Sequence, residues 1–185
     1  MKFKFDRLKI IWLIVGFIAA TLFLLLSSYS LVVTSRTNFC ISCHEMRFVA
    51  EQGWMYSTHY NNKSGVVAGC SDCHIPPGPF EYIWTKTRDG ITDIVVHTFG
   101  ENNPEKMDWE RLKGVARHHM SDSSCLRCHK NLTPVGASIK TLEAHREYIR
   151  FKNKKCIECH NKEFHGRFKE MLNKNNVSDA SEVQR

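Results

Sequence analysis

No cysteine of this 185-residue chain lies outside four short motifs of the form Cys-x-x-Cys-His. The cysteine pairs are Cys40 and Cys43, Cys70 and Cys73, Cys125 and Cys128, and Cys156 and Cys159, followed directly by His44, His74, His129 and His160. A disulfide framework would leave the histidines unexplained, and tetrahedral zinc sites would not require a histidine after every pair. The pattern therefore favours four covalently bound haem c groups, in which the two thiols bond one porphyrin and the histidine can be an axial iron ligand.

Charged residues are absent from Ile10 to Ser35, a run of 26 mainly apolar residues. As a helix, this run would extend about 39 Å, which is enough to cross a bilayer. A cleaved signal peptide is the alternative, but its apolar core would normally be shorter, and no clear Ala-x-Ala pattern follows Ala19 and Ala20. We therefore predict an uncleaved transmembrane anchor over 10–35, after a short N-terminus over 1–9.

Positive charge exceeds negative charge ahead of this run, with Lys2, Lys4, Arg7 and Lys9 against Asp6. The positive-inside rule then places the N-terminus in the cytoplasm and the remainder beyond the cytoplasmic (inner) membrane, in the periplasm, where haem of this kind is attached. The formal net charge of +7 does not indicate a nucleic-acid partner, because four haems would bring about eight negative propionates. The basic side chains are expected to meet propionates or lipid headgroups.

The spacing of the motifs indicates an internal duplication. Their starts are separated by 30, 55 and 31 residues, and His59 and His145 each precede the next motif by 11 residues. Such a period predicts two similar dihaem halves. Low-spin haem needs a second axial ligand, and six histidines lie outside the motifs. The candidates are His59, His145 and His165, with His118 and His119 as alternatives and His97 as the weakest, in an apolar stretch.

We predict a mainly α fold with much irregular loop: one N-terminal transmembrane helix and a multihaem cytochrome c domain over 36–172. Because about 150 residues must surround four haems, the haems take the place of a conventional apolar core. Helices are predicted at 79–99, where Gly90 is a candidate for a bend, at about 103–119 and at 140–151. The polar tail over 173–185 is predicted to be disordered.

The segment 79–99 carries chemistry beyond the motifs. At 100° per residue, one face is apolar and another is polar: Phe80, Ile83, Trp84, Ile91, Ile94 and Val95 against Lys86, Asp89 and Asp93. Periodicity alone favours an ordinary amphipathic helix packed on haem, although such a helix could also lie on a bilayer. A lysine and a carboxylate beside a haem at the membrane would suit quinol oxidation, one holding the quinone oxygen and the other accepting protons.

With these features the chain resembles the NapC/NirT/NrfH family of membrane-anchored tetrahaem cytochromes c, quinol dehydrogenases that supply electrons to periplasmic reductases. The resemblance covers residues 1–170. It is closest in Cys-Ile-Ser-Cys-His-Glu-Met at 40–46, Thr-His-Tyr-Asn-Asn-Lys-Ser-Gly-Val at 58–66, Lys-Thr-Arg-Asp-Gly at 86–90, and Cys-Ile-Glu-Cys-His at 156–160 followed by His165.

The resemblance implies specific roles. In the nitrite reductase small subunits of the family, a methionine at the place of Met46 ligates the first haem iron. The resemblance therefore implies that Met46 binds this iron and leaves His44 free, although His44 stays an alternative. Lys86 would be the quinol-site lysine, and Asp93 the acidic group beside the first haem. The same resemblance makes distal ligands of His59, His145 and His165. A methionine ligand would raise the potential of the first haem above that of bis-histidine haems.

One position departs from part of the family. Pro77 stands where nitrate-reductase-type members have a histidine, whereas the Lys-x-Arg-Asp-Gly run is nearer to the nitrite reductase small subunit. This leaves the sixth ligand of one haem open, and a partner protein could supply it.

The sequence thus predicts a quinol-oxidising electron-transfer enzyme. Menaquinol or ubiquinol would bind near the first haem, with Lys86 holding it and Asp93 or Asp89 assisting proton release. Electrons would pass along four haems to a docked periplasmic terminal reductase, of which the nitrite reductase type is favoured. The alternatives are a membrane-bound electron shuttle without a quinol site and a small-molecule reductase with an open iron position.

Overall fold

The computed structural model describes residues 7–161 and 164–165, and within these ranges every regular element is a helix. The elements are α1 (Arg7–Val33), α2 (Thr37–Cys40), α3 (His44–Gln52), the 3₁₀ turn η1 (Trp54–Tyr56), α4 (Cys70–His74), α5 (Pro79–Phe99), α6 (Trp109–His119), α7 (Asp122–Leu126), α8 (Ile139–Phe151) and α9 (Cys156–Cys159). The mainly α prediction with long loops is confirmed. The tail over 173–185 lies outside the described residues.

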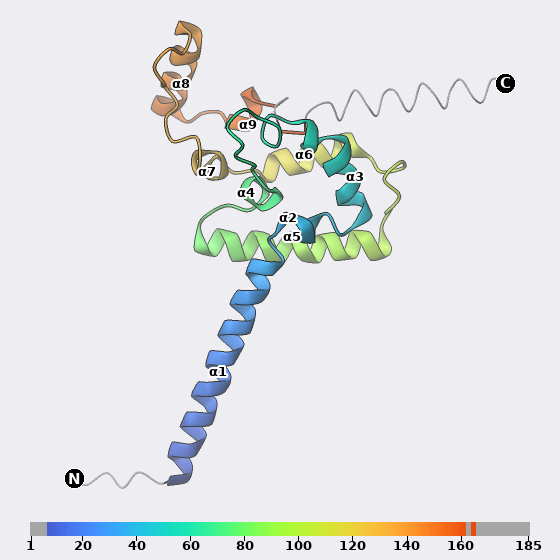
Figure 1. The fold of residues 1–185 in the computed structure, drawn as a ribbon, viewed down its shortest axis with the longest axis vertical. Coiled ribbons are helices and arrows are strands. Elements are labelled where there is room, and N and C mark those ends of the chain that lie inside the picture. Colours follow the sequence, from blue (N-terminus) through green and yellow to red (C-terminus); the bar gives the residue numbers. More distant parts are fainter. Residues whose placement is uncertain (1–6, 162–163, 166–185) are drawn as a thin grey trace, which may run out of the picture.

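Helix α1 projects away from the rest of the chain as a single rod (Figure 1). Its 27 residues are long and apolar enough to cross a membrane, and none of them is buried. The helix begins at Arg7 and ends at Val33, close to the 10–35 span predicted from the absence of charge. Its exposed apolar surface would be covered by lipid rather than by the domain.

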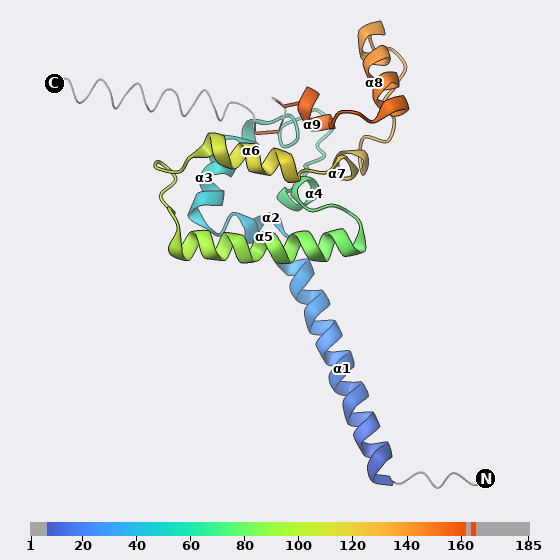
Figure 2. The same cartoon turned by 180° about the vertical axis from the view of Figure 1, so that it is seen from behind.

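Helix α5 lies across the end of α1 in both views (Figures 1 and 2). Gly78 precedes it, Pro79 occupies its first turn and Gly100 follows it, a pattern typical of helix ends. The helix has the predicted bounds and continues through Gly90. A hydrogen bond from Lys86 Nζ to the Thr34 carbonyl oxygen (2.8 Å) ties α5 to the chain that leaves α1.

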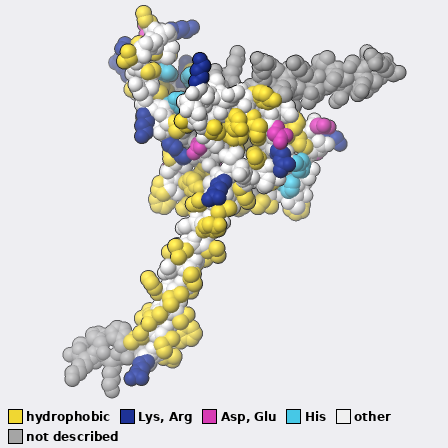
Figure 3. Space-filling view, viewed as in Figure 1, with side chains coloured by type: hydrophobic (Ala, Val, Ile, Leu, Met, Phe, Trp, Pro, Cys, Tyr) yellow, Lys and Arg dark blue, Asp and Glu magenta, His cyan; other side chains and the backbone are white. Residues whose placement is uncertain are grey.

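The apolar face of α5 is exposed. Phe80 and Phe99 each expose 84 % of their surface and Trp84 exposes 70 %. Figure 3 shows hydrophobic side chains along α1 and along the lower edge of the domain, where α5 lies. The apolar surface of the membrane-spanning candidate therefore continues at an angle onto the underside of the domain.

Two other helices test the sequence predictions. Helix α8 begins at Ile139, one residue before the predicted start, because the Ser138 hydroxyl caps it by accepting from the Thr141 N–H (3.2 Å). Helix α6 begins at Trp109, later than the predicted start near 103. The Asp108 carboxylate accepts from the Arg111 N–H (3.0 Å) and sets that start, while the preceding residues form a turn.

The polypeptide has almost no apolar core of its own. Among the described residues, Ala50 and Ile157 are the buried hydrophobic side chains. Helices alone without an apolar interior would not repay the entropy of ordering the chain. The fold therefore fits a domain in which large cofactors provide the missing apolar centre.

Candidate functional site

The four motifs lie in a row. Helices α2, α4, α7 and α9 contain or end at their first cysteines, and α2 contacts α4, α4 contacts α7, and α7 contacts α9. All eight cysteines are free thiols. Among the described residues, the one group of three potential metal ligands within 4.8 Å is Cys43, Glu45 and His97, so no four thiolates gather as a tetrahedral zinc site requires.

The predicted attachment cysteines are not enclosed by the polypeptide. Cys43, Cys128 and Cys159, the second cysteines of three motifs, are exposed, and the other five cysteines are half-buried. A site enclosed by the polypeptide would instead have buried thiols. The physical reason is that the domain has almost no apolar core to surround the thiols. Thiols at the surface are accessible to a porphyrin, which would cover them once bonded.

The two halves repeat one contact. The Cys70 N–H donates to the Thr37 hydroxyl (3.3 Å), and the Cys156 N–H donates to the Asp122 carboxylate (2.9 Å). Thr37 and Asp122 each lie three residues before the first cysteine of the preceding motif. The internal duplication seen in the spacing therefore has a counterpart in how the motifs pack in pairs.

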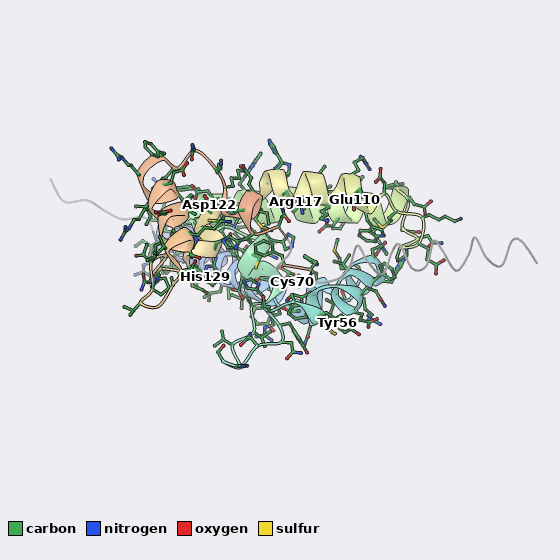
Figure 4. The ribbon with its side chains drawn as sticks, turned by 90° about the horizontal axis from the view of Figure 1, so that it is seen from above. Tyr56, Cys70, Glu110, Arg117, Asp122 and His129 are labelled. Atoms are coloured by element: carbon green, nitrogen blue, oxygen red, sulfur yellow. The ribbon has the colours of Figure 1, made fainter. Side chains whose placement is uncertain are left out.

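A separate contact joins the halves. Arg127, inside the third motif, lies with Nη1 3.2 Å from the Asp72 carboxylate of the second motif, and its Nη2 donates to the Ile75 carbonyl oxygen (3.3 Å). Figure 4 shows Cys70 of α4 beside the α7 segment that carries Asp122 and leads to His129. The second and third motifs are thus held side by side.

Three motif histidines each face one histidine from outside the motifs. The ring centroids are 6.0 Å apart for His129 and His59, 6.2 Å for His74 and His165, and 6.1 Å for His160 and His145. Two imidazoles on one iron would have centroids about 6 Å apart, from two metal–nitrogen bonds of about 2.0 Å and about 1.1 Å from each nitrogen to its ring centre. The three spacings fit bis-histidine haem.

Local contacts prepare these distal histidines. His145 Nδ1 donates to the Leu132 carbonyl oxygen (2.6 Å), which leaves Nε2 for a metal. His165 Nδ1 is buried and has no hydrogen-bond partner among the described residues. Burial, with the positive charges of His74 and Lys113, lowers the pKa of His165 to about 4, so the ring is neutral, as a metal ligand must be.

His165 reaches the N-terminal half because Gly53 lets its backbone approach closely. A Cβ at position 53 would lie 2.8 Å from the His165 carbonyl oxygen and 3.2 Å from its Cβ. His59 also stacks on Phe164, with centroids 5.5 Å apart. The C-terminal histidine is therefore positioned by the N-terminal half, a contact that the sequence did not indicate.

The first motif differs from the other three. His44 Nε2 donates to the Asn102 carbonyl oxygen (2.6 Å), and its Nδ1 lies 3.6 Å from the Glu45 carboxylate. Both ring nitrogens thus face oxygen atoms of the protein. Met46, two residues further along α3, is 40 % exposed. The arrangement suits the role that the resemblance gave to Met46, with His44 off the iron.

Glu45 is the buried carboxylate of this region, with 4 % of its surface exposed. It accepts a hydrogen bond from His97 Nδ1 (2.7 Å). Burial raises the pKa of Glu45, but hydrogen bonds from its own main-chain N–H and from His97 outweigh burial and hold the pKa below its ordinary value. The carboxylate is therefore ionised beside the first motif. Sequence reasoning did not single out Glu45 or Asn102.

The polar residues of α5 form a stripe at helical spacing: Lys86, Asp89, Asp93 and His97. The charges of Lys86 and Asp93 both act on the Cys40 thiol, so the stripe faces the first motif. Asp89 is paired with Arg88, whose Nη2 lies 2.7 Å from its carboxylate. Of the predicted quinol-site residues, the structure brings Lys86 and Asp93 to the first motif and gives Asp89 a cationic partner.

The Asp93 residue is exposed, but its carboxyl group is partly desolvated by the surrounding chain. This partial burial, together with the negative charges of Asp89 and Glu45, raises the pKa of Asp93 to about 6. A carboxyl that titrates near the working pH is suited to proton transfer. Lys86 Nζ is a charged donor at the carboxyl end of α1, and Asp93 lies two turns further along the same stripe of α5.

Known proteins with similar sequences and folds match most of the chain. The model of the "NapC/NirT cytochrome c family, N-terminal region" matches residues 4–171. Cytochrome c-type protein TorC of Escherichia coli K12 is 31 % identical over 156 residues, covering 79 % of this chain and 39 % of TorC. NapC of the same organism is 31 % identical over 158 residues, covering 80 % of this chain and 77 % of NapC. This chain therefore spans well under half of TorC.

A solved structure shares the fold. The cytochrome c nitrite reductase NrfHA complex bound to the HQNO inhibitor matches with a TM-score of 0.50 and 22 % identity, covering 82 % of this chain and 88 % of that chain. The match over 4–171 includes α1, all four motifs and the polar stripe of α5. The chain therefore belongs to the NapC/NirT cytochrome c family, whose members are membrane-anchored multihaem c-type cytochromes in quinol-linked electron transfer.

Proposed function

We propose that this chain oxidises quinol at the membrane surface and passes the electrons through four covalently bound haem c groups to a periplasmic terminal reductase. The observation that carries the proposal is the stripe on α5, where Lys86 and Asp93 face the first motif at the end of α1. A lipid-soluble quinol that leaves the bilayer beside α1 would meet this stripe first.

Lys86 and Asp93 have separate roles at the quinol. The Lys86 ammonium has three N–H donors, one of which is engaged by Thr34, so it can bind a quinol oxygen and favour its negative charge. Asp93, with its pKa at about 6, is ionised at neutral pH and accepts the proton. The Asp89 carboxylate is engaged in an ion pair with Arg88, which leaves Asp93 as the more available base.

The haem groups, when bound, supply one-electron carriers whose potentials depend on their axial ligands. We assign His59 with His129, His74 with His165, and His145 with His160 as the ligands of three irons, on the basis of their ring spacings. Met46 is assigned to the first iron, because His44 is held by Asn102 and Glu45.

The orientation of the domain supports the fourth motif as the point where electrons leave for the reductase. Helix α9 lies on the side of the domain away from α1 and α5 (Figures 1 and 2). With the N-terminus in the cytoplasm, this side would face the periplasm, where a soluble reductase can dock. We favour a nitrite reductase as the partner class, because the Lys-x-Arg-Asp-Gly run at 86–90 resembles that of the nitrite reductase small subunit.

The test is reduction of the purified full-length protein, in detergent, by menadiol and separately by dithionite, followed by haem absorbance. We expect Lys86→Leu to abolish reduction by menadiol and to leave reduction by dithionite intact. Lys140→Leu, an exposed lysine of α8, is the matched control and should behave as wild type. Normal menadiol reduction of Lys86→Leu would remove Lys86 from the site. A wild-type protein that menadiol does not reduce would instead favour an electron shuttle without a quinol site.

A further inference from the structure

We propose that helix α5 lies on the membrane surface as a second lipid contact of the protein, with its apolar face among the lipid headgroups and the upper acyl chains. The inference concerns how the domain is seated on the bilayer, and it does not depend on quinol oxidation. We call this apolar face the lipid face, which consists of Phe80, Ile83, Trp84, Ile91, Ile94 and Val95.

The lipid face is exposed and carries no charge. Its six side chains expose between 49 % and 84 % of their surface. At 100° per residue they fall within an arc of about 120°, so one flat surface can cover all of them. A contiguous apolar surface of this kind marks a contact with a protein partner or with a membrane.

The lipid face points away from the first haem-attachment motif. The charges of Lys86 and Asp93 act on the Cys40 thiol, so the polar stripe is the side of α5 that faces this motif. The centre of the polar stripe lies about 140° around the helix from the centre of the lipid face. A helix that packed on this haem through its apolar face would have the opposite orientation. The first haem therefore leaves the lipid face uncovered.

Continuity with α1 identifies lipid as the occupant of this face. The Lys86 ammonium donates to the Thr34 carbonyl oxygen, and the Tyr82 and Ser35 hydroxyls are hydrogen-bonded to each other. These contacts hold α5 against the end of α1, and hydrophobic side chains continue from α1 to the lower edge of the domain (Figure 3). A protein partner on the lipid face would have to enter the angle between α1 and α5, which is the space that lipid headgroups occupy around a membrane-spanning helix.

The position of α5 along the axis of α1 matches the headgroup layer. Two exposed aromatic residues of α1, Trp12 and Tyr29, are 17 residues apart, which corresponds to about 26 Å along a helix. Aromatic side chains at this separation are typical of the two boundaries of the hydrocarbon core. Lys86 ties α5 to Thr34, which lies about 8 Å beyond Tyr29 along the same axis. The headgroup layer extends about 5–8 Å beyond the hydrocarbon core, so α5 lies within it.

Apolar contact, rather than charge, would hold α5 at this surface. Glu81, Asp89 and Asp93 outnumber Lys86 and Arg88, so the helix is not basic. Anionic lipids attract basic segments and would give this helix no added affinity. We therefore expect the same contact on neutral and on anionic membranes, as for a helix that binds lipid through its buried apolar area.

The test labels the wild-type holoprotein in vesicles of phosphatidylcholine that carries a photoreactive diazirine on its upper acyl chain. After illumination and proteolysis, mass spectrometry identifies the segments bonded to lipid. We expect adducts in α1 and in 79–99, and none in 139–151. Ile139 and Phe151 of that segment are also exposed, but α8 lies on the side of the domain away from α1 (Figures 1 and 2). Vesicles that also contain phosphatidylglycerol should give the same pattern.

A matched pair of double variants locates the contact on the lipid face. Ile91→Glu combined with Ile94→Glu should remove most of the label from 79–99, because carboxylates do not enter the acyl region. Ile139→Glu combined with Phe151→Glu is the control in α8 and should leave the label on 79–99 unchanged. Haem content, measured in parallel, verifies that each variant is assembled.

Label on α1 without label on 79–99 would show that a second copy of the chain or another protein covers this face, and would overturn the proposal. Equal label on 79–99 and 139–151, or full label in the α5 double variant, would overturn it as well. Labelled α5 in a protein that menadiol does not reduce would contradict the proposed function and leave this inference in place, so the two failures are distinguishable.

Discussion

Lys86 Nζ donates a hydrogen bond of 2.8 Å to the carbonyl oxygen of Thr34, at the point where the chain leaves the apolar helix α1. The last carbonyl groups of a helix lack partners within it and carry partial negative charge, so a lysine is favourable there. Tyr82, one turn earlier on α5, reaches the Ser35 hydroxyl. The proposed quinol-binding side chain is therefore also part of the joint between the anchor and the domain.

This double role predicts different results for two substitutions. Lys86→Arg keeps the positive charge and a donor for Thr34, so reduction of the haems by quinol should slow by less than about tenfold. Lys86→Leu removes a charged donor to the developing negative oxygen, and the rate should fall by about 100-fold or more. Stopped-flow reduction by menadiol measures both. Equal losses in the two variants would show that a positive donor at position 86 is not sufficient, which would contradict the role given to the Lys86 charge.

Asp93 predicts a pH dependence. Its pKa of about 6 means that the carboxylate is ionised above that pH and protonated below it. The rate of quinol oxidation should therefore fall as the pH drops through 6, by about tenfold per unit, because the protonated form cannot accept a proton. Asp93→Asn should be slow at every pH and should lack this limb. Initial rates of menadiol oxidation over the acid range measure the profile, and a wild-type limb that persists in Asp93→Asn would assign it to another group.

Gly53 predicts a distant effect on a metal ligand. In Gly53→Ala the new methyl group would lie 2.8 Å from the His165 carbonyl oxygen, which forces the C-terminal segment away. The iron that faces His74 should lose its second histidine and become high-spin. Gly114→Ala in α6 is the matched control, because a methyl group there meets no atom within 4 Å. Electron paramagnetic resonance reports the spin states. Low-spin iron throughout in Gly53→Ala would detach His165 from the proposed ligand set.

Asp122 predicts a local loss of stability. Its carboxylate accepts from the Cys156 N–H (2.9 Å) and from the Tyr148 hydroxyl (2.7 Å). Asp122→Ala leaves two partly buried donors without their acceptor, which should lower the free energy of unfolding by about 1–3 kcal/mol. Asp122→Asn keeps one acceptor oxygen and should lose less. Thermal unfolding of both variants provides the measurement, and equal stability of alanine and wild type would show that the carboxylate is dispensable.

Local signals predicted the helices well where they were strong. Pro79 after Gly78, and Gly100 at the other end, delimit α5, and its bounds were confirmed. The predicted start of α6 was wrong, because the apolar periodicity extends upstream of Asp108, whose carboxylate caps the first turn. Periodicity measures which side chains share a face. It does not measure which residue caps the helix.

Which histidines face one another could not be predicted from the sequence. The duplication makes His59 and His145 equivalent in sequence, and a strict repeat would place each beside the second motif of its own half. His145 does face His160, but His59 faces His129 of the other half, and His165 faces His74 instead. Spacing identifies equivalent residues and carries no record of where the chain crosses between halves. The contact of Gly53 with His165 is one such crossing.

The most direct test of the whole account is the haem content of the purified full-length chain. Pyridine haemochrome absorbance, set against protein concentration, should give four haems c for each chain, and the mass of the intact protein should rise by four covalently attached haems. Absence of the haemochrome spectrum, or zinc bound by the cysteine pairs, would contradict the account.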